Sequence, residues 1–212
     1  MSAAASSLAL IGRGQLFDDI AANWNLLAHG CTLLPLRLES VDAAIHDTGV
    51  LLAGLDPAQT RFFAAVDAQA VNHARLDVYA KARLMGFRGD SLRHPSAIVA
   101  GNVRMGENCW IGAGAVIAHG VQIGNNTIVG DGVRIGSGAK LGANGWVGAG
   151  ASIGAGTTLG QHCLIGRDVR LDAGLQIGRH CVIDVPGAHT ETLTDGTFID
   201  PLFPHPVRIY GR

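Results

Sequence analysis

Residues 99–188 read VAGNVR-MGENCW-IGAGAV-IAHGVQ-IGNNTI-VGDGVR-IGSGAK-LGANGW-VGAGAS-IGAGTT-LGQHCL-IGRDVR-LDAGLQ-IGRHCV-IDVPGA, fifteen hexads without interruption. The first position is always Val, Met, Ile or Leu, the second is nearly always Gly, and the fifth is mostly small or β-branched. A fixed internal period of this kind indicates a repeat architecture. The hexad is therefore the unit from which we derive the fold.

The positions of the hexad predict a three-sided prism. The fifth residue of one hexad and the first of the next lie two positions apart, so in a strand both side chains point to one side, here inward. The fourth position is Asn, Gly, His or Asp in the first fourteen hexads, residue types that tolerate a positive φ. Short strands joined by such corners, three hexads to a coil, predict about five coils stacked at about 4.8 Å each.

Residues eighteen positions apart stack in columns on this prism. Only one of the three outward columns is wholly apolar, and it consists of Trp110, Ile128, Trp146, Leu164 and Val182. A stripe of exposed large apolar side chains marks an interface. We expect this face to pack against neighbouring subunits in a homotrimer. The alternative is that the N-terminal part or the C-terminal tail of the same chain covers it.

Composition limits the function classes. The chain has 212 residues and a net charge of −1, so no basic surface for nucleic acid is expected. No stretch approaches the 18 or more apolar residues of a membrane span. The cysteines form no CxxC pair and no zinc or redox motif; they are Cys31, Cys109, Cys163 and Cys181. We expect a cytoplasmic protein with reduced thiols and no bound metal.

Residues 1–92 alternate between strand and helix patterns and predict a small α/β domain. Strands are expected at 31–36, 50–52 and 61–66, and helices at 15–28 and 71–85. The turn Gly12-Arg13-Gly14 follows an apolar run and precedes a helix, an arrangement that can hold a phosphate or can simply give a tight βα turn. We expect the β-helix to span 93–188, and the tail 189–212 to cap its open end.

The stretch LRHPSAIVAGNVRMGENCWIGAGAVIAHGVQIG, residues 92–124, resembles the sialic acid O-acetyltransferase and UDP-4-amino-sugar N-acetyltransferase family. In that family a Rossmann-like domain precedes a His-Pro-Ser-Ala junction, matched here by residues 94–97, and then a left-handed parallel β-helix. Residues 72–87 resemble the Arg-containing helix before the junction. The resemblance implies an acyltransferase with acetyl-CoA as acyl donor, N- or O-transfer to a nucleotide-linked sugar, and substrate contacts at Gly12, Arg13, Gly14 and Arg75.

The family's catalytic histidine occupies the third position of an Ile-Glu-His-Asp hexad. Here that hexad begins Ile117-Ala118-His119-Gly120, so the resemblance implies that His119 is the general base, while both flanking acids are absent. Ile128 stands where the family has a second active-site histidine, and the first glycine turn lacks the Gly-Gly-His-Gly form. A neutral imidazole suits proton abstraction from an amine or hydroxyl near pH 7.

The column that contains His119 carries small residues in the coils that follow. We expect a shallow groove there for the pantetheine arm of the donor, with Ser137, Gly154 and Ala155 as contacts. Arg170 is the candidate partner of the CoA phosphates. The opposing interpretation is that small residues only suit tight corners.

Two alternative functions are compatible with the same repeat. A catalytically inactive scaffold or binding homologue would explain the missing acids. A γ-carbonic-anhydrase-like metal enzyme shares the fold, but its zinc-binding histidines include a pair close in sequence that this helix lacks. We interpret His162 and His180, one coil apart, as corner residues.

Overall fold

The computed structural model describes residues 6–27, 30–68 and 72–209. The chain divides into two compact units, Met1–Leu92 and Arg93–Arg212. Among the described residues, no helix has the length and apolar character needed to cross a membrane.

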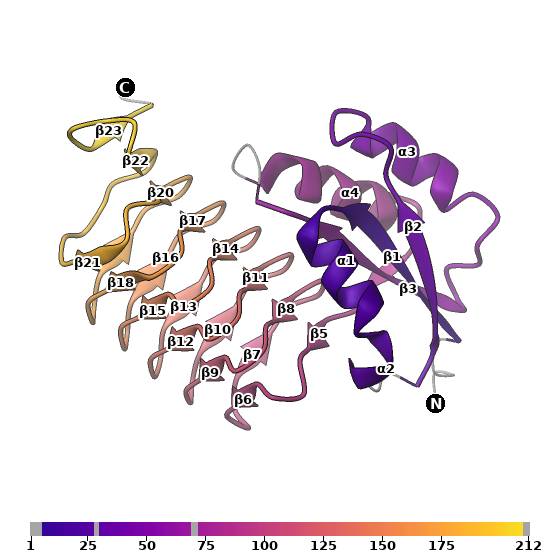
Figure 1. Cartoon of the computed structure of the whole chain (residues 1–212), viewed down its shortest axis with the longest axis horizontal. Coiled ribbons are helices and arrows are strands. Elements are labelled where there is room, and N and C mark those ends of the chain that lie inside the picture. Colours follow the sequence, from indigo (N-terminus) through magenta and orange to yellow (C-terminus); the bar gives the residue numbers. More distant parts are fainter. Residues whose placement is uncertain (1–5, 28–29, 69–71, 210–212) are drawn as a thin grey trace. The chain divides into compact units, whose positions relative to one another are not determined.

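The first unit is a parallel sheet with helices (Figure 1). Its strands follow the order β2-β1-β3-β4, with parallel pairing throughout. The strands are β1 (Ser7–Arg13), β2 (Thr32–Arg37), β3 (Thr60–Val66) and β4 (Arg88–Gly89). The helices are α1 (Gln15–Ala22), α2 (Trp24–Leu27), α3 (Ala44–Leu51) and α4 (His73–Leu84). The expected strand at 50–52 is wrong, because Val50 and Leu51 belong to α3 and Leu52 is its C-cap. Ala44, Thr48 and Leu52 are buried at a helical spacing of four.

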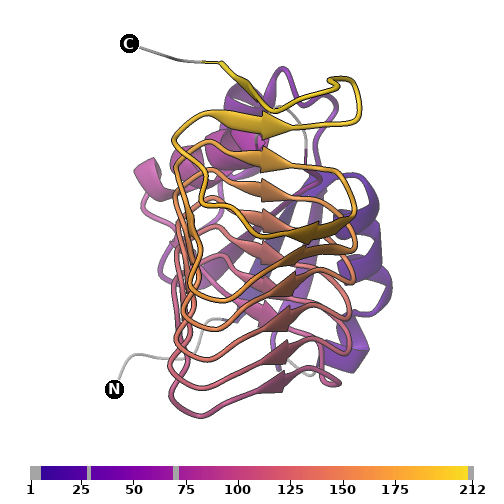
Figure 2. The same cartoon turned by 90° about the vertical axis from the view of Figure 1, so that its left-hand side faces the viewer.

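The second unit is the predicted left-handed β-helix, whose coils stack along one axis (Figure 2). Its short strands pair in parallel, except that the last one, Val207–Arg208, is antiparallel to its neighbour. One face holds β6 (Ile98–Val99), β9 (Val116–Ile117), β12 (Arg134–Ile135), β15 (Ser152–Ile153), β18 (Val169–Leu171) and β21 (Gly187–His189). The next face holds β7 (Arg104–Met105), β10 (Gln122–Ile123), β13 (Lys140–Leu141), β16 (Thr158–Leu159) and β19 (Gln176–Ile177). The third face holds β5 (Leu92–Arg93), β8 (Trp110–Ile111), β11 (Ile128–Val129), β14 (Trp146–Val147), β17 (Leu164–Ile165), β20 (Val182–Ile183), β22 (Thr197–Ile199) and β23 (Val207–Arg208).

The hexad positions behave as the periodicity predicts. First-position and fifth-position residues from successive coils form one continuous apolar core. The fourth position has a positive φ in every hexad from Met105 to Val182. Asn102, in the first hexad, is the exception among the fourteen predicted corners. Strands pair in register at an interval of eighteen residues, for example Ile128 with Trp146.

The apolar outward column is less accessible than predicted. Trp110, Ile128 and Val182 are 7%, 1% and 7% exposed, and only Trp146 and Leu164 are half-buried. At the C-terminal end of the column, Val182 is followed by a further strand in which Phe198 pairs with it. The expectation of five exposed side chains is therefore wrong.

A ladder of buried amides runs along the corner between the second and third faces. Asn108 donates from Nδ2 to Asn126 Oδ1 at 2.7 Å, and Asn126 donates in the same way to Asn144 at 2.7 Å. The Nδ2 of Asn144 then lies 2.9 Å from Nδ1 of His162. Because an amide nitrogen can only donate, His162 Nδ1 is the acceptor in this contact. The ring of His180 stacks on that of His162, with centroids 4.5 Å apart.

A corner asparagine has two structural functions: its amide extends the ladder, and its backbone adopts a positive φ. Substitutions at Asn126 separate the two. Asn126→Gly keeps a residue suited to positive φ but removes the side-chain amide. It should lower the free energy of unfolding by about 1–3 kcal/mol, because the buried partners of Asn126 lose their hydrogen bonds. Asn126→Ala should cost about 1–2 kcal/mol more, since its φ of 56° then strains an alanine. Urea denaturation followed by circular dichroism measures both. If Asn126→Gly were as stable as the parent protein, the hydrogen bonds of the ladder would not contribute to stability.

Candidate functional site

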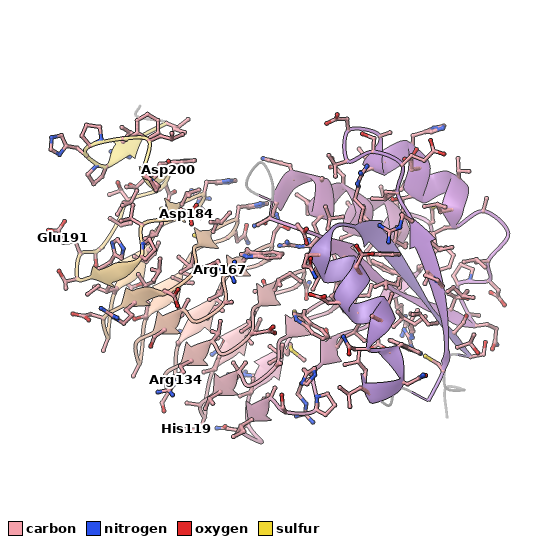
Figure 3. The ribbon with its side chains drawn as sticks, viewed as in Figure 1. His119, Arg134, Arg167, Asp184, Glu191 and Asp200 are labelled. Atoms are coloured by element: carbon pink, nitrogen blue, oxygen red, sulfur yellow. The ribbon has the colours of Figure 1, made fainter. Side chains whose placement is uncertain are left out.

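His119 lies on an exposed corner between β9 and β10. Figure 3 labels it at the edge of the β-helix, with its side chain directed away from the coil. The corner is held from both sides, because Gly120 N donates to Asn102 Oδ1 at 3.0 Å and Gly138 N donates to the His119 carbonyl oxygen at 3.0 Å. The backbone that carries the imidazole is therefore fixed by the preceding and the following coil.

The imidazole itself has one hydrogen-bond partner among the described residues. Ser137 Oγ, one coil further along the same column, lies 3.2 Å from His119 Nδ1. The Nε2 atom makes no hydrogen bond to any residue that the structure describes. An exposed, singly anchored imidazole with one ring nitrogen available can accept a proton from a bound nucleophile.

The other residues predicted to contact the donor lie along the same corner. Ser137, Gly154 and Ala155 belong to the two coils that follow His119, and Arg170 is exposed on β18 of the adjacent face. At Gly154 a Cβ would come within 2.4 Å of the Ala173 backbone nitrogen. Close approach of the next coil is therefore a sufficient reason for glycine at the second position of this hexad. The expected groove for the donor is not needed to explain it.

One groove of the β-helix unit lies on another part of its surface. It has a volume of about 650 Å³ and runs along the face of β7, β10, β13 and β16, where its lining includes Arg104 and Lys140. His119 does not line it. Arg179, at one end, is paired with Asp195 at 2.9 Å. Hydrogen bonds from the Arg179 backbone and guanidinium lower the pKa of Asp195.

The β1–α1 turn of the first unit is tightly packed. A Cβ at Gly12 would overlap the Ala65 carbonyl oxygen at 1.8 Å, and one at Gly14 would overlap the Asp67 carboxylate at 2.2 Å. Close approach to the backbone thus requires glycine at position 12, whereas the positive φ of 97° favours glycine at position 14. Arg13 is exposed and its guanidinium donates to the Glu39 carbonyl oxygen. The fourth predicted substrate contact, Arg75, is 0% exposed and donates to Asn72 Oδ1 at 3.3 Å.

Asp67 is a residue that the sequence interpretation missed. Its carboxylate accepts from Gln15 N at 2.8 Å and from Leu16 N at 3.0 Å, at the N-terminus of α1. The N-cap residue, Gly14, has no side chain to do this. A carboxylate is favourable there because the free amides and the helix dipole attract negative charge. A phosphate at these two amides would have to displace Asp67.

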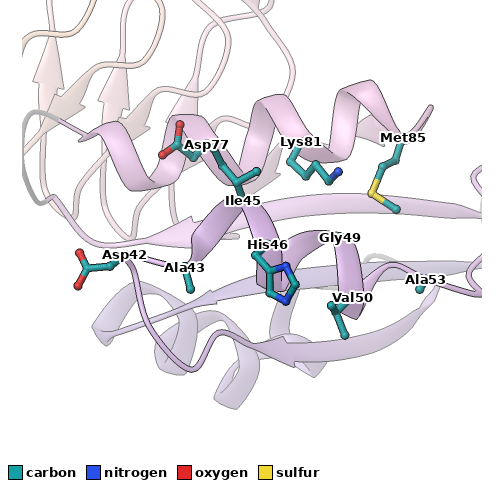
Figure 4. Close-up of a pocket in the computed structure, with 10 residues that line it drawn as sticks. All are labelled: Asp42, Ala43, Ile45, His46, Gly49, Val50, Ala53, Asp77, Lys81 and Met85. Atoms are coloured by element: carbon teal, nitrogen blue, oxygen red, sulfur yellow. The ribbon is translucent and has the colours of Figure 1, made fainter.

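A pocket in the first unit contains none of the site residues predicted from the sequence. A pocket of about 770 Å³ lies between α3 and α4 and is lined by Ile45, His46, Asp77, Lys81 and others (Figure 4). Among the described residues, no group of three or more His, Cys, Asp or Glu side chains could hold a metal ion. His162 and His180 occupy left-handed corners, with φ of 60° and 56°.

Removing the Asp67 carboxylate should destabilise the first unit. Asp67→Ala leaves two amides of α1 without their partner, so we expect a loss of about 1–2 kcal/mol in the free energy of unfolding. Asp42→Ala, at an exposed aspartate, is the matched control. Equal denaturation midpoints for the two variants would show that the cap contributes nothing.

Comparison with known proteins agrees with this architecture. Residues 102–137 match the family model described as bacterial transferase hexapeptide (six repeats), and residues 156–184 match the hexapeptide repeat of succinyl-transferase. No curated protein matches the chain significantly.

Solved structures resemble nearly the whole chain. PerB from Caulobacter crescentus, in complex with CoA and GDP-perosamine, is 24% identical over 92% of this chain and 94% of its own, with a TM-score of 0.69. The acetyltransferase domain of PglB from Neisseria gonorrhoeae, in complex with acetyl coenzyme A, is 20% identical over 92% and 96%, with a TM-score of 0.61. WeeI from Acinetobacter baumannii is 11% identical over 95% and 100%, with a TM-score of 0.59. The chain is therefore a hexapeptide-repeat protein of the left-handed β-helix fold, and its resemblance to these structures extends over both of its units.

Proposed function

We propose that the protein is an acyl-CoA-dependent acyltransferase that transfers an acetyl group to an amine or hydroxyl of a nucleotide-linked sugar. The observation that carries the proposal is the match of both units together to PerB, which was solved with CoA and GDP-perosamine. The β-helix alone would support many functions. The PglB domain, solved with acetyl coenzyme A, supports the same donor.

In this proposal His119 is the general base. Its Nε2 atom takes a proton from the acceptor amine or hydroxyl as that group attacks the thioester carbonyl. The donor supplies the activated acyl group, and the carbon–sulfur bond breaks as the new amide or ester bond forms. The proton held on His119 then passes to the departing thiolate. His119 suits the task because its imidazole is exposed and its Nδ1 is anchored.

The remaining site residues have supporting functions in the proposal. Ser137, Gly154 and Ala155 keep bulky side chains away from the corner beyond His119, and Arg170 offers an exposed cation for the donor's phosphates. Gly12, Arg13 and Gly14 of the first unit are the proposed acceptor contacts, and Arg13 is the exposed cation among them. Arg75, being fully buried, contributes by holding Asn72.

His119→Ala should lower acceptor-dependent turnover at least about 100-fold while CoA binding is retained, since general bases contribute roughly 10²–10⁴ in rate. Thiol release from acetyl-CoA over a panel of nucleotide 4-amino sugars measures turnover, and calorimetry measures CoA binding. His162→Asn is the matched control, because asparagine occupies the equivalent corners at positions 126 and 144. It should retain the parent rate.

Other outcomes would redirect the assignment. A parent protein that fails to bind CoA would contradict the acyltransferase proposal and favour a scaffold, consistent with the missing acids beside His119. An active His119→Ala variant would retain the enzyme class and exclude this base. Loss of activity in His162→Asn, with zinc in the purified protein, would favour the metal enzyme.

We also propose a homotrimer with active sites between subunits. Trp146 and Leu164 are the accessible members of the apolar column, and Ile98 and Val116, 67% and 38% exposed, lie on the adjacent face.

Light scattering should give three times the chain mass of 22.0 kDa. Trp146→Glu should yield folded monomer, because a charge at a buried contact is costly. Leu202→Glu, at a tail position that is 84% exposed, should leave the trimer intact. A monomeric parent protein would contradict the assembly.

A further inference from the structure

We propose that Ser137 is a positioning residue for His119: its hydroxyl oxygen accepts from Nδ1–H and so holds the imidazole in the tautomer whose Nε2 can act as base. The inference rests on the proposed function for its catalytic meaning, but its structural content can be measured without activity. It assigns to Ser137 a task other than contact with the donor.

The geometry places the two side chains in one column of the β-helix. Ser137 follows His119 by eighteen residues, and Oγ lies 3.2 Å from Nδ1. The same pair of coils is joined by the bond from Gly138 N to the His119 carbonyl oxygen at 3.0 Å. The backbone register thus brings the hydroxyl to the ring.

The direction of this hydrogen bond decides the reactivity of the ring. If the hydroxyl donates to Nδ1, the ring proton lies on Nε2 and that atom cannot accept another from the acceptor. If Nδ1–H donates to the hydroxyl, Nε2 carries the lone pair. Proton transfer to Nε2 then gives an imidazolium whose Nδ1–H still donates to Ser137. Only the second arrangement serves a general base.

The β-helix does not need a hydroxyl at this position. The same column has Gly101 before His119, and Ala155 and Ala173 after Ser137. Since alanine forms the equivalent corner in two other coils, Ser137→Ala should fold normally. The absence of acidic residues beside His119, at Ala118 and Gly120, leaves this serine as the hydrogen-bond partner of the ring among the described residues.

Nitrogen-15 NMR of histidine-labelled protein measures the tautomer directly, with the His119 signals identified by their loss in His119→Gln. We expect neutral His119 in the parent protein to carry its proton on Nδ1. In Ser137→Ala it should shift to the Nε2–H form, since the tautomer follows the hydrogen bond at the other nitrogen. An Nε2–H ring in the parent protein, or an unchanged ring in the variant, would overturn the inference.

Kinetics provide the second test. Ser137→Ala should lower kcat about tenfold, the size expected for a hydrogen bond to a charged group, with the KM for acetyl-CoA unchanged. Ser137→Thr, which keeps a hydroxyl, should restore most of the rate, and Ser152→Ala on β15 is the matched control. A raised KM with unchanged kcat would instead make Ser137 a donor contact. If the parent protein has no turnover, the proposed function fails while the NMR result still decides the tautomer.

Discussion

The left-handed corner at every sixth residue is the constraint on which this structure depends. It turns the chain at a constant interval, so that each residue lies above the one eighteen positions earlier. The apolar first and fifth positions then meet inside, and the outward positions form columns. The cost is backbone strain at each corner, which Gly, Asn, Asp and His tolerate better than other residues.

Close approach of successive coils follows from the same constraint. At Gly136 a Cβ would lie 2.5 Å from the Ala155 nitrogen, and at Gly124 it would lie 2.5 Å from the Ala143 nitrogen. A side chain at these second positions would therefore overlap the next coil, whereas third positions accept larger side chains such as that of His119. His119 and Ser137 both occupy third positions, which is why residues far apart in sequence can form a hydrogen-bonded pair on the surface.

The sequence predicted most of the second unit because its hexads are local and periodic. It located His119 on a corner and the turn residues at their positive φ values. Prediction from the sequence failed for features that depend on contacts between segments far apart in the chain. The run Val50–Leu52 has a strand-like composition, yet α3 packs against the core through residues spaced by four. Asp67 could not be found because nothing in the sequence links it to the amides at Gln15 and Leu16.

The amide ladder has a direction, since Asn108 and Asn126 donate towards the C-terminal end, and Asn126 and Asn144 accept from the coil before. Deleting one whole coil of eighteen residues would join Asn108 to Asn144 with donor and acceptor still matched. Deleting a single hexad would instead rotate all later columns by one face and set amides against unrelated side chains. The coil of eighteen residues, and not the visible hexad, is therefore the unit that can be removed without disturbing the ladder.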